Sequence, residues 1–322
     1  SGRLAHAAAR TRTPTHAHKR ATDTSPGGGS LPGLGGPDAG LARDRDGEWS
    51  VSQSPPFTLA VVHAHPDDEA IFTAAATLWA RDRGIRTVLV TCTNGQLGID
   101  PSGRAGNHPA HDAPATRRTR RMELDRAADD AGIDRVICLD YPDSGMAGWP
   151  GNDSPESFTR QPLDVVASAI REVLIAERVD VVLTYDARGF YGHPDHIMVH
   201  RGVMAAVTPG DTSVQRVFYP VMPHRLVTAA RNLAAEGVAV PAWIELATAC
   251  DDTSIDVVIT AEGRAENKQR AIAAHQSQTD NADIVALEPV RFNSLFGREY
   301  YQCGWSSSDT TMDPEDLFGG LR

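Results

Sequence analysis

The sequence predicts an α/β protein with a Rossmann-like, mostly parallel sheet and helices on both faces. From Phe57 onward, apolar runs of strand length alternate with longer segments that have a helical period. The strand-like runs are almost continuously apolar, which is typical of strands buried on both sides. Alternation of such strands with helices indicates parallel pairing, with the connecting helices covering the two faces of the sheet.

The expected elements of the first half follow one another in order. The expected strands are FTLAVVHA (57–64), RTVLVTCT (86–93), RVICLD (135–140) and VDVVLTYD (179–186). The expected helices are EAIFTAAATLWARDRG (69–84), TRRTRRMELDRAADDAG (116–132) and LDVVASAIREVLIAER (163–178). Gly84 and Gly132 end the first two helices, because glycine is a common stop signal. No G-x-G-x-x-G follows the first strand, although the fold class is Rossmann-like.

The second half is less regular. A strand is expected over about 214–220 (VQRVFYP) and a helix over about 262–278 (EGRAENKQRAIAAHQSQ), while residues 221–260 remain ambiguous. The loop 94–115 is long for a compact domain. Structureless loops of that size are usually functional or mobile, so we expect a lid or a substrate loop there.

The N-terminal segment differs from the rest of the chain. Residues 1–54 include the Gly/Pro-rich stretch SPGGGSLPGLGGPDAG and show no sustained period, which predicts a disordered extension. Residues 55–322 are expected to form a single domain. No stretch reaches the roughly 18 to 20 apolar residues of a membrane span. The basic N-terminus also lacks the apolar core of a secretory signal.

The composition indicates a globular protein that does not bind nucleic acid. The 322 residues are 41% hydrophobic and 23% charged, and the net charge is −11. Nucleic-acid binding needs clustered Lys and Arg, and the expected domain has no basic stripe. The four cysteines are far apart and form no C-x-x-C pair, which fits free thiols in a reducing cytoplasm. A homo-oligomer is compatible with these observations.

Two polar segments follow expected strands. HPDDE (65–69) comes after the first strand and FYGHPDH (190–196) after the fourth. Ligands of open α/β sheets bind beyond the carboxyl ends of the strands, which is where both segments should lie. Each segment contains H-P-D, in which the proline restricts the backbone after the histidine. Taken alone, a D-D pair is most often a solvated helix N-terminus and H-P-D a turn, but two such segments in one sheet favour a metal site.

The residue types in these segments suit a divalent metal. Catalytic zinc takes three protein ligands, such as His and Asp/Glu, and keeps a fourth position open. His65 and Asp68 lie three apart at a turn into a helix, and His196 from the other segment completes a His/Asp/His set. Such a set suits Zn²⁺, and Fe²⁺ would also be accepted. The remaining neighbours are the types that hydrolysis needs as base, oxyanion donor and acid: Asp67, Tyr191, His193 and Asp195.

AHPDDE together with YGHPDH resembles the motifs of the PIG-L or LmbE-like family of zinc-dependent N-acetylglucosaminyl deacetylases. The segments VTCTNGQLG, RRMELDRAADDAGI, YPDSGMAG, VVLTYD and AIAAHQSQT are similar to segments of its mycothiol-pathway branch. That branch contains a deacetylase acting on N-acetylglucosaminyl-inositol and an amidase acting on mycothiol conjugates. The resemblance covers residues 57–206 with specific motifs and 262–302 weakly.

The resemblance implies a chemical role for each matching position. His65, Asp68 and His196 match the zinc ligands. Asp67 matches the base that takes a proton from the attacking water. His193 matches the residue that protonates the departing amine or stabilises the charge that develops.

Four further matches concern the oxyanion, the orientation of a histidine and the sugar. Tyr191 matches a donor to the tetrahedral oxyanion, and Asp195 matches a residue that orients a neighbouring histidine. Arg120 and Asp143 align with sugar-contacting positions. A surface salt bridge or a turn is the alternative role for the last two.

The other histidines and Glu69 are expected to have supporting roles. His63 is expected to be structural or to support a ligand, and Glu69 to support the start of the helix. His108 and His111 lie in the long loop and are expected to be solvated. His275 matches a late family histidine, but packing or capping explains it equally well.

The predicted function is hydrolytic removal of the N-acetyl or N-acyl group from an N-acetylglucosamine-containing small molecule, with Zn²⁺ as cofactor. Within the enzyme class, the alternatives are an amidase of mycothiol-type conjugates and a deacylase of a glycosylated natural product. From another class, a non-catalytic sugar- or metal-binding module is the alternative, although a pure binder has no need of a base such as Asp67. A metallophosphoesterase is less favoured, because its sites usually hold two metals and more bridging carboxylates.

Overall fold

The chain divides into two compact units, residues 1–52 and 53–322. The computed structural model describes residues 41–43, 49–51, 57–207, 211–247, 249–261 and 263–321. In the first unit, β1 (Leu41–Arg43) pairs antiparallel with β2 (Trp49–Val51). Apart from β1 and β2, the residues 1–54 for which disorder is expected lie outside the described ones. The single domain expected over 55–322 stays a prediction.

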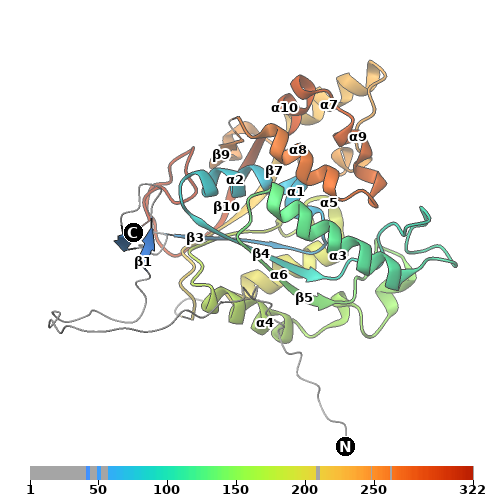
Figure 1. Ribbon diagram of the computed structural model, residues 1–322, viewed down its shortest axis with the longest axis horizontal. Coiled ribbons are helices and arrows are strands. Elements are labelled where there is room, and N and C mark those ends of the chain that lie inside the picture. Colours follow the sequence, from blue (N-terminus) through green and yellow to red (C-terminus); the bar gives the residue numbers. More distant parts are fainter. Residues whose placement is uncertain are drawn as a thin grey trace, which may run out of the picture. The chain divides into compact units, whose positions relative to one another are not determined.

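The second unit contains one mostly parallel sheet (Figure 1), with the strand order β5-β4-β3-β6-β7-β10-β9 and β8 paired to β7. The strands are β3 (Thr58–His63), β4 (Arg86–Thr93), β5 (Arg135–Tyr141), β6 (Val181–Leu183), β7 (Arg216–Pro223), β8 (Ala249–Cys250), β9 (Val257–Thr260) and β10 (Arg298–Ser306). Every pairing from β5 through β7 is parallel, and β10 is antiparallel to both of its neighbours. The predicted fold class is confirmed.

The first strand of the sheet, β3, is its topological switch point. The chain passes from β3 outward through β4 to β5, and then returns to the opposite side of β3 with β6 and continues outward to β7. A crevice opens at the carboxyl ends of the two strands where such a reversal occurs, and ligands of doubly wound folds bind there. HPDDE begins two residues after the end of β3, and FYGHPDH begins seven residues after the end of β6.

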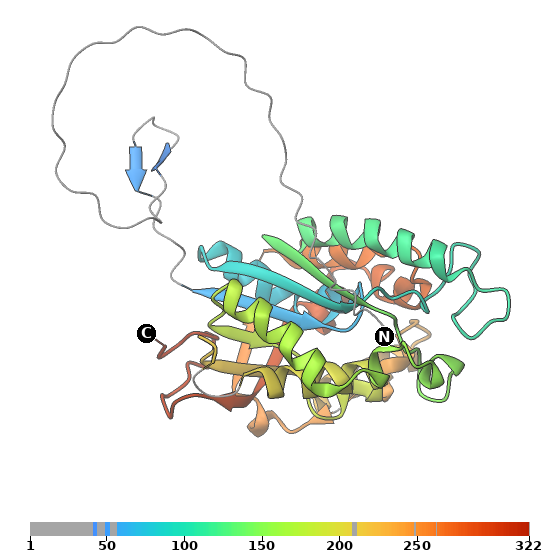
Figure 2. The same cartoon turned by 90° about the horizontal axis from the view of Figure 1, so that it is seen from below.

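Helices cover both faces of the sheet (Figure 2). The helices are α1 (Asp68–Phe72), α2 (Ala74–Asp82), α3 (Ala113–Asp130), α4 (Leu163–Ala176), α5 (Gly189–Gly192), α6 (Pro194–Ala206), α7 (His224–Ala235), α8 (Ala265–Ala274), α9 (Ala282–Val285) and α10 (Pro289–Phe296). Successive residues of β3 point to opposite faces. Val61 belongs to one buried cluster with Leu124 of α3, whereas Val62 belongs to another with Val166 of α4 and Met198 of α6. Among the described helices, none has the length and apolar character needed to cross a bilayer.

The helix predicted over residues 69–84 is interrupted at Thr73. Thr73 has φ −139°, so α1 ends and α2 begins there. Its hydroxyl lies 2.9 Å from Nε2 of His63 and 3.2 Å from the carbonyl oxygen of Glu69. A buried threonine that bonds locally to the backbone competes with the regular helical pattern. His63 therefore has the structural role expected of it.

A buried ion pair supports the start of α2. The carboxylate of Glu299 accepts hydrogen bonds from the backbone amides of Ala75 and Ala76, at 2.8 and 2.9 Å. It also accepts from the Tyr301 hydroxyl at 2.6 Å, and it pairs with the Lys268 ammonium at 2.6 Å. The carboxylate thereby satisfies two amides that have no partner within the helix. One buried charge thus connects α2, α8 and β10.

Replacement of Lys268 by methionine is expected to lower the free energy of unfolding by about 3–5 kcal/mol, because it leaves a buried carboxylate without its cationic partner. Methionine is an apolar side chain of similar length, so the loss reports mainly the missing charge. Urea unfolding measures the difference. The exposed pair Arg231–Glu245 provides the control, and Arg231→Ala should leave the unfolding midpoint unchanged. An unchanged midpoint in Lys268→Met would contradict a stabilising contribution of the Lys268–Glu299 pair.

Candidate metal centre

A cavity of about 540 Å³ lies at the carboxyl edge of the sheet, and its volume is typical of a small-molecule site. Most of the predicted site residues line it: His65, Asp67, Asp68, Arg120, Asp143, Tyr191 and His193. Asp195 and His196 are fully buried, and both lie within hydrogen-bond distance of His65. The structure therefore brings all of the predicted residues to one place.

Donor atoms of three of these residues lie close together. His65 Nδ1 lies 3.3 Å from Asp68 Oδ2, and His196 Nε2 lies 3.4 Å from Asp68 Oδ1. The two imidazole nitrogens, His65 Nδ1 and His196 Nε2, are 3.3 Å apart. Ligands that bind zinc tetrahedrally at about 2.0–2.1 Å are separated from one another by about 3.3 Å. The two nitrogens have this spacing, and each lies at a similar distance from its own oxygen of Asp68, so the donor types and distances of this cluster suit a divalent cation.

The outer nitrogen of each histidine has an acceptor that selects the required tautomer. His196 Nδ1 lies 3.2 Å from the carbonyl oxygen of Gly189, and His65 Nε2 lies 3.2 Å from Oδ2 of Asp195. When these outer nitrogens carry the protons, the inner nitrogens have free lone pairs for a metal. Gly189 has φ 66°, and a Cβ there would lie 2.8 Å from the His196 Cβ. This close approach requires glycine at that position.

Tyr185 supports the cluster and was missed by the sequence analysis. It is fully buried, and its hydroxyl donates to Asp68 Oδ2 at 2.7 Å while it accepts from the Ala64 amide at 2.9 Å. Its ring stacks on that of His196, with centroids 4.0 Å apart. The only signal in the sequence was its position at the end of an apolar strand, in VVLTYD. Tyr185 thus orients one candidate ligand by a hydrogen bond and another by packing.

Asp67 lies beside the cluster in an unusual backbone conformation. Its φ is 127°, which for a residue other than glycine costs of order 1–3 kcal/mol and occurs mainly at functional sites. Its Oδ1 lies 3.1 Å from Nη2 of Arg120. Burial raises the pKa of Asp67 to about 6, and Arg120 opposes this rise. A bound cation would lower this pKa, so the carboxylate is ionised and can act as a base near neutral pH.

His193 and Tyr191 present hydrogen-bond donors to the cavity. His193 Nδ1 accepts from the backbone amide of Asp195 at 3.1 Å, so the neutral ring carries its proton on Nε2. Burial, followed by the neighbouring His65 and His196, lowers the pKa of His193 well below its usual value. Burial also raises the pKa of Tyr191 well above its usual value, with Asp68 adding to the effect. Both groups are therefore neutral donors in the cavity wall.

Arg120 and Asp143 line the cavity but are already engaged with the backbone. Arg120 is 3% exposed, and its guanidinium donates to the carbonyl oxygens of Gly95 (2.8 Å) and Pro66 (2.5 Å). Asp143 Oδ1 accepts from the Gly145 amide at 2.7 Å and lies 3.7 Å from His65 Nε2. Although burial opposes it, His65 holds the pKa of Asp143 well below its usual value. A contact of either residue with a sugar stays a prediction.

The expectation that both loop histidines are solvated was wrong for His111. Its side chain is only 4% exposed, and its two ring nitrogens lie 2.7 Å from the carbonyl oxygen of Gln96 and 3.0 Å from that of Arg104. It therefore ties two parts of the loop 94–115 together. His108 is exposed, as expected.

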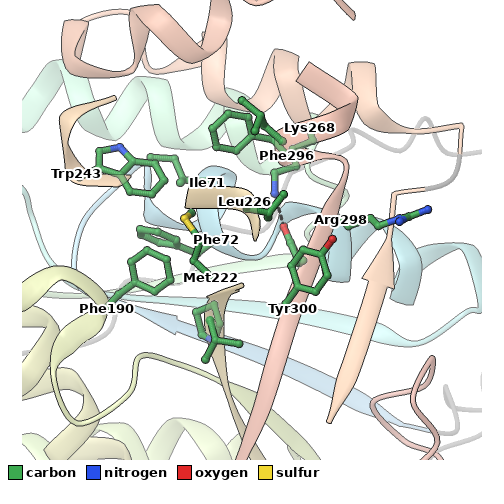
Figure 3. A pocket seen from close by; sticks show the side chains of 14 residues that line it. Ile71, Phe72, Phe190, Met222, Leu226, Trp243, Lys268, Phe296, Arg298 and Tyr300 are labelled. Carbon is green, nitrogen blue, oxygen red and sulfur yellow. Dashed lines mark hydrogen bonds and ion pairs between the residues drawn. The ribbon is translucent and has the colours of Figure 1, made fainter. Parts of the chain in front are cut away.

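Apolar side chains form another wall of the cavity. Ile71, Phe72 and Trp243 line both this cavity and a smaller one of about 40 Å³, and Figure 3 shows them around the smaller one with Phe190. The Phe72 ring lies 4.7 Å from that of Phe190 and 6.3 Å from that of His196, measured between centroids. The cluster thus has an apolar side, and the low local dielectric there strengthens electrostatic interactions within it.

The protein combines a doubly wound α/β sheet with a His/Asp/His cluster at the switch point of that sheet. It is therefore an α/β protein with a candidate divalent-metal centre in a ligand cavity. Residues 60–207 match the family model PIG-L, described as GlcNAc-PI de-N-acetylase. A curated relative from Salinispora arenicola is 32% identical over 288 residues, which cover 84% of this chain and 94% of the relative. The chain belongs to the PIG-L family, and the resemblance seen in its motifs is confirmed.

The relatives are named for the same reaction. The Salinispora arenicola protein is named 1D-myo-inositol 2-acetamido-2-deoxy-alpha-D-glucopyranoside deacetylase. A relative from Catenulispora acidiphila, named deacetylase 1 for the same compound, is 32% identical over 82% of this chain and 89% of its own length. Among solved structures, a deacetylase from the biosynthesis pathway of teicoplanin superposes with a TM-score of 0.53 at 16% identity, covering 79% of this chain and 100% of its own. At that identity the superposition supports the fold alone.

Proposed function

We propose that this protein is a metal-dependent hydrolase that removes the acetyl group from an N-acetylglucosamine-containing small molecule, releasing acetate and a free amine. The observation that carries the proposal is the cluster of His65, Asp68 and His196, in which the two imidazole nitrogens lie 3.3 Å apart and each lies 3.3 or 3.4 Å from a different oxygen of Asp68, with Asp67 beside them. A pure metal-binding site has no need of a buried carboxylate next to its ligands. The names of the two relatives support N-deacetylation of an amino sugar.

Each residue of the cavity has a place in this chemistry. A bound Zn²⁺ or Fe²⁺ would polarise the acetamide carbonyl and acidify water at neutral pH. Asp67 takes the proton of the attacking water. The Tyr191 hydroxyl and the neutral His193 Nε2–H donate hydrogen bonds to the charge that develops in the tetrahedral intermediate, and Asp67 passes the proton it has taken to the departing amine. Asp195 holds His65 in its tautomer through its carboxylate, and its backbone amide orients His193.

The cavity favours an uncharged substrate. Its lining includes the carboxylates of Asp280 and Asp283 and the indole rings of Trp149 and Trp243. Arg120 is the single Arg or Lys among the described lining residues, and its guanidinium is engaged with backbone carbonyls. Aromatic faces suit sugar rings, and carboxylates accept hydrogen bonds from hydroxyls but repel phosphate. We therefore propose a neutral glycosyl polyol, such as N-acetylglucosaminyl-inositol, rather than a phosphodiester.

The test measures amine release from a panel of substrates, with the metal content of the same sample determined in parallel. The panel contains N-acetylglucosaminyl-inositol, its 1-phosphate ester, a mycothiol-type conjugate, free N-acetylglucosamine and an acylated glycopeptide. We expect kcat/KM for the neutral inositol conjugate to exceed that for its phosphate ester by at least about tenfold, an unfavourable charge interaction of about 1.4 kcal/mol. Preference for the phosphate ester would contradict the charge argument. Silence across the panel from a fully metal-loaded sample would contradict the amino-sugar proposal.

We also propose that the protein works in the cytoplasm. The four cysteines Cys92, Cys138, Cys250 and Cys303 are free thiols, which is usual in a reducing compartment. A homo-oligomer stays a prediction.

A further inference from the structure

A buried carboxylate–imidazole pair lies next to the proposed base, and the proposed reaction does not use it. Glu69, in the first turn of α1, is 0% exposed, and His275, directly after α8, is 2% exposed. Glu69 Oε1 and His275 Nε2 are 2.7 Å apart. The pair joins two segments that are 206 residues apart in the sequence. Burying both groups is unfavourable unless each forms a hydrogen bond with the other. The buried pair is therefore expected to have a structural or functional role.

The second oxygen of Glu69 holds the backbone of the proposed base. Glu69 Oε2 accepts the backbone N–H of Asp67 at 2.9 Å. Asp67 is the residue with φ 127°, a conformation that persists only when its surroundings hold it there. Arg120 holds the same residue from the other side, through the Pro66 carbonyl and the Asp67 carboxylate. Asp67 is therefore held at its backbone amide by Glu69 and at its side chain by Arg120.

His275 compensates the charge that this arrangement requires. Asp67, Asp68 and Glu69 are three consecutive carboxylates, and Glu69 is the most deeply buried of them. A carboxylate in that position needs a cationic or strongly donating partner, and His275 provides it. Burial opposes a charged imidazole, but Glu69 and then Asp67 raise the pKa of His275 above its usual value. His275 is thus the donor that keeps Glu69 an acceptor for the Asp67 amide.

We propose that Glu69 and His275 are positioning residues: together they hold the Asp67 backbone in the conformation that directs its carboxylate to the attacking water. This inference rests on the proposed role of Asp67 as the base. The competing explanation is that the pair only fastens the end of α8 to α1. The two explanations differ in whether loss of the pair acts through Asp67.

The test is a double-variant cycle of Glu69→Ala and Asp67→Ala, assayed by amine release with metal content measured in every sample. Glu69→Ala should lower kcat about 10- to 100-fold, since a misplacement of about 1 Å can have an effect of that size. KM should stay within about threefold and the metal content should not change, because the substrate walls and the ligands are intact. In the Asp67→Ala background, Glu69→Ala should cause no further loss, because residues that act as one unit are not additive.

Conservative and matched variants complete the design. Glu69→Gln retains an oxygen that can accept the Asp67 amide, so it should recover most of the kcat lost in Glu69→Ala. His275→Ala, run through the same cycle with Asp67→Ala, should also be non-additive. Glu123→Ala is the matched control, because Glu123 is a buried carboxylate that bonds the Ser277 amide at 2.8 Å, two residues from His275. It should leave kcat within about threefold of the parent value, as most substitutions away from a site do.

Three outcomes would overturn the inference: an unchanged kcat in Glu69→Ala, loss of metal in that variant, or losses that multiply in the double variant. The parent protein separates this failure from failure of the proposed function. An inactive parent with full metal content contradicts the deacetylase proposal. An active parent with an unaffected Glu69→Ala variant contradicts only the positioning pair.

Discussion

Asp67→Ala is expected to reduce kcat by about 10³-fold or more while metal content stays at the parent level, because a positioned general base contributes about 10²–10⁴-fold. Asp67 lies next to the candidate ligands but contributes no atom to the cluster of His65, Asp68 and His196. Its removal should therefore stop proton abstraction without opening the metal site. Steady-state amine release and metal analysis of one preparation test both parts of the expectation.

Asp67→Asn is the stricter form of the same experiment. The amide oxygen can still accept from Arg120, so the turn is retained while the base is lost. Burial raises the pKa of Asp67 to about 6, and a bound cation would lower it, so the parent enzyme should gain activity as the pH rises up to about 6. A base works only when deprotonated, and this acid limb should therefore disappear in the residual activity of Asp67→Asn. Loss of metal in either variant would overturn the separation of base from ligands.

Asp68→Ala is expected to abolish metal binding and activity together. The loss of a partner that only orients a ligand typically lowers metal affinity about 10- to 100-fold, so loss of a direct ligand should have a larger effect. Because a ligand that binds only the folded state stabilises it, removal of metal by a chelator should lower the Tm of the parent protein. The same treatment should leave the Tm of Asp68→Ala unchanged.

His193→Ala is the matched control for the ligand assignment. Nitrogens of His65, His193 and His196 also lie within 4.8 Å of one another, so geometry alone permits a set of three histidines. We assign Asp68 instead, because its two oxygens lie 3.3 and 3.4 Å from the inner nitrogens of His65 and His196. His193→Ala should therefore lose turnover but keep its metal. Metal retained in Asp68→Ala and lost in His193→Ala would establish the histidine set.

Several features of the protein could be predicted because they depend on local sequence. Runs such as FTLAVVHA and RTVLVTCT are strand-length and apolar throughout, and this pattern alone indicates a strand buried between two layers of helices. In a parallel sheet all strands end at the same edge, so the polar residues that follow two of them had to lie there. That is why the two H-P-D segments identified the cluster of His65, Asp68 and His196 without coordinates.

Other features depend on partners that are distant in the sequence. The break at Thr73 depends on a contact with His63, and the burial of His111 depends on carbonyl groups elsewhere in its loop. Residues 221–260 stayed ambiguous although α7 has a helical period of its own, because β8 and β9 are short strands that form by pairing with β7 and β10.

The sequence by itself determined the layered fold, the edge at which the site lies and the donor types of the candidate metal cluster, since strand period and strand ends are local properties. Only the tertiary structure decided which atoms meet. Tyr185 reaches Asp68 across 117 residues, and His275 reaches Glu69 across 206. Such hydrogen bonds depend on directions and distances of a few tenths of an ångström. Those are set by the packing of whole helices and strands, and no short stretch of one sequence contains them.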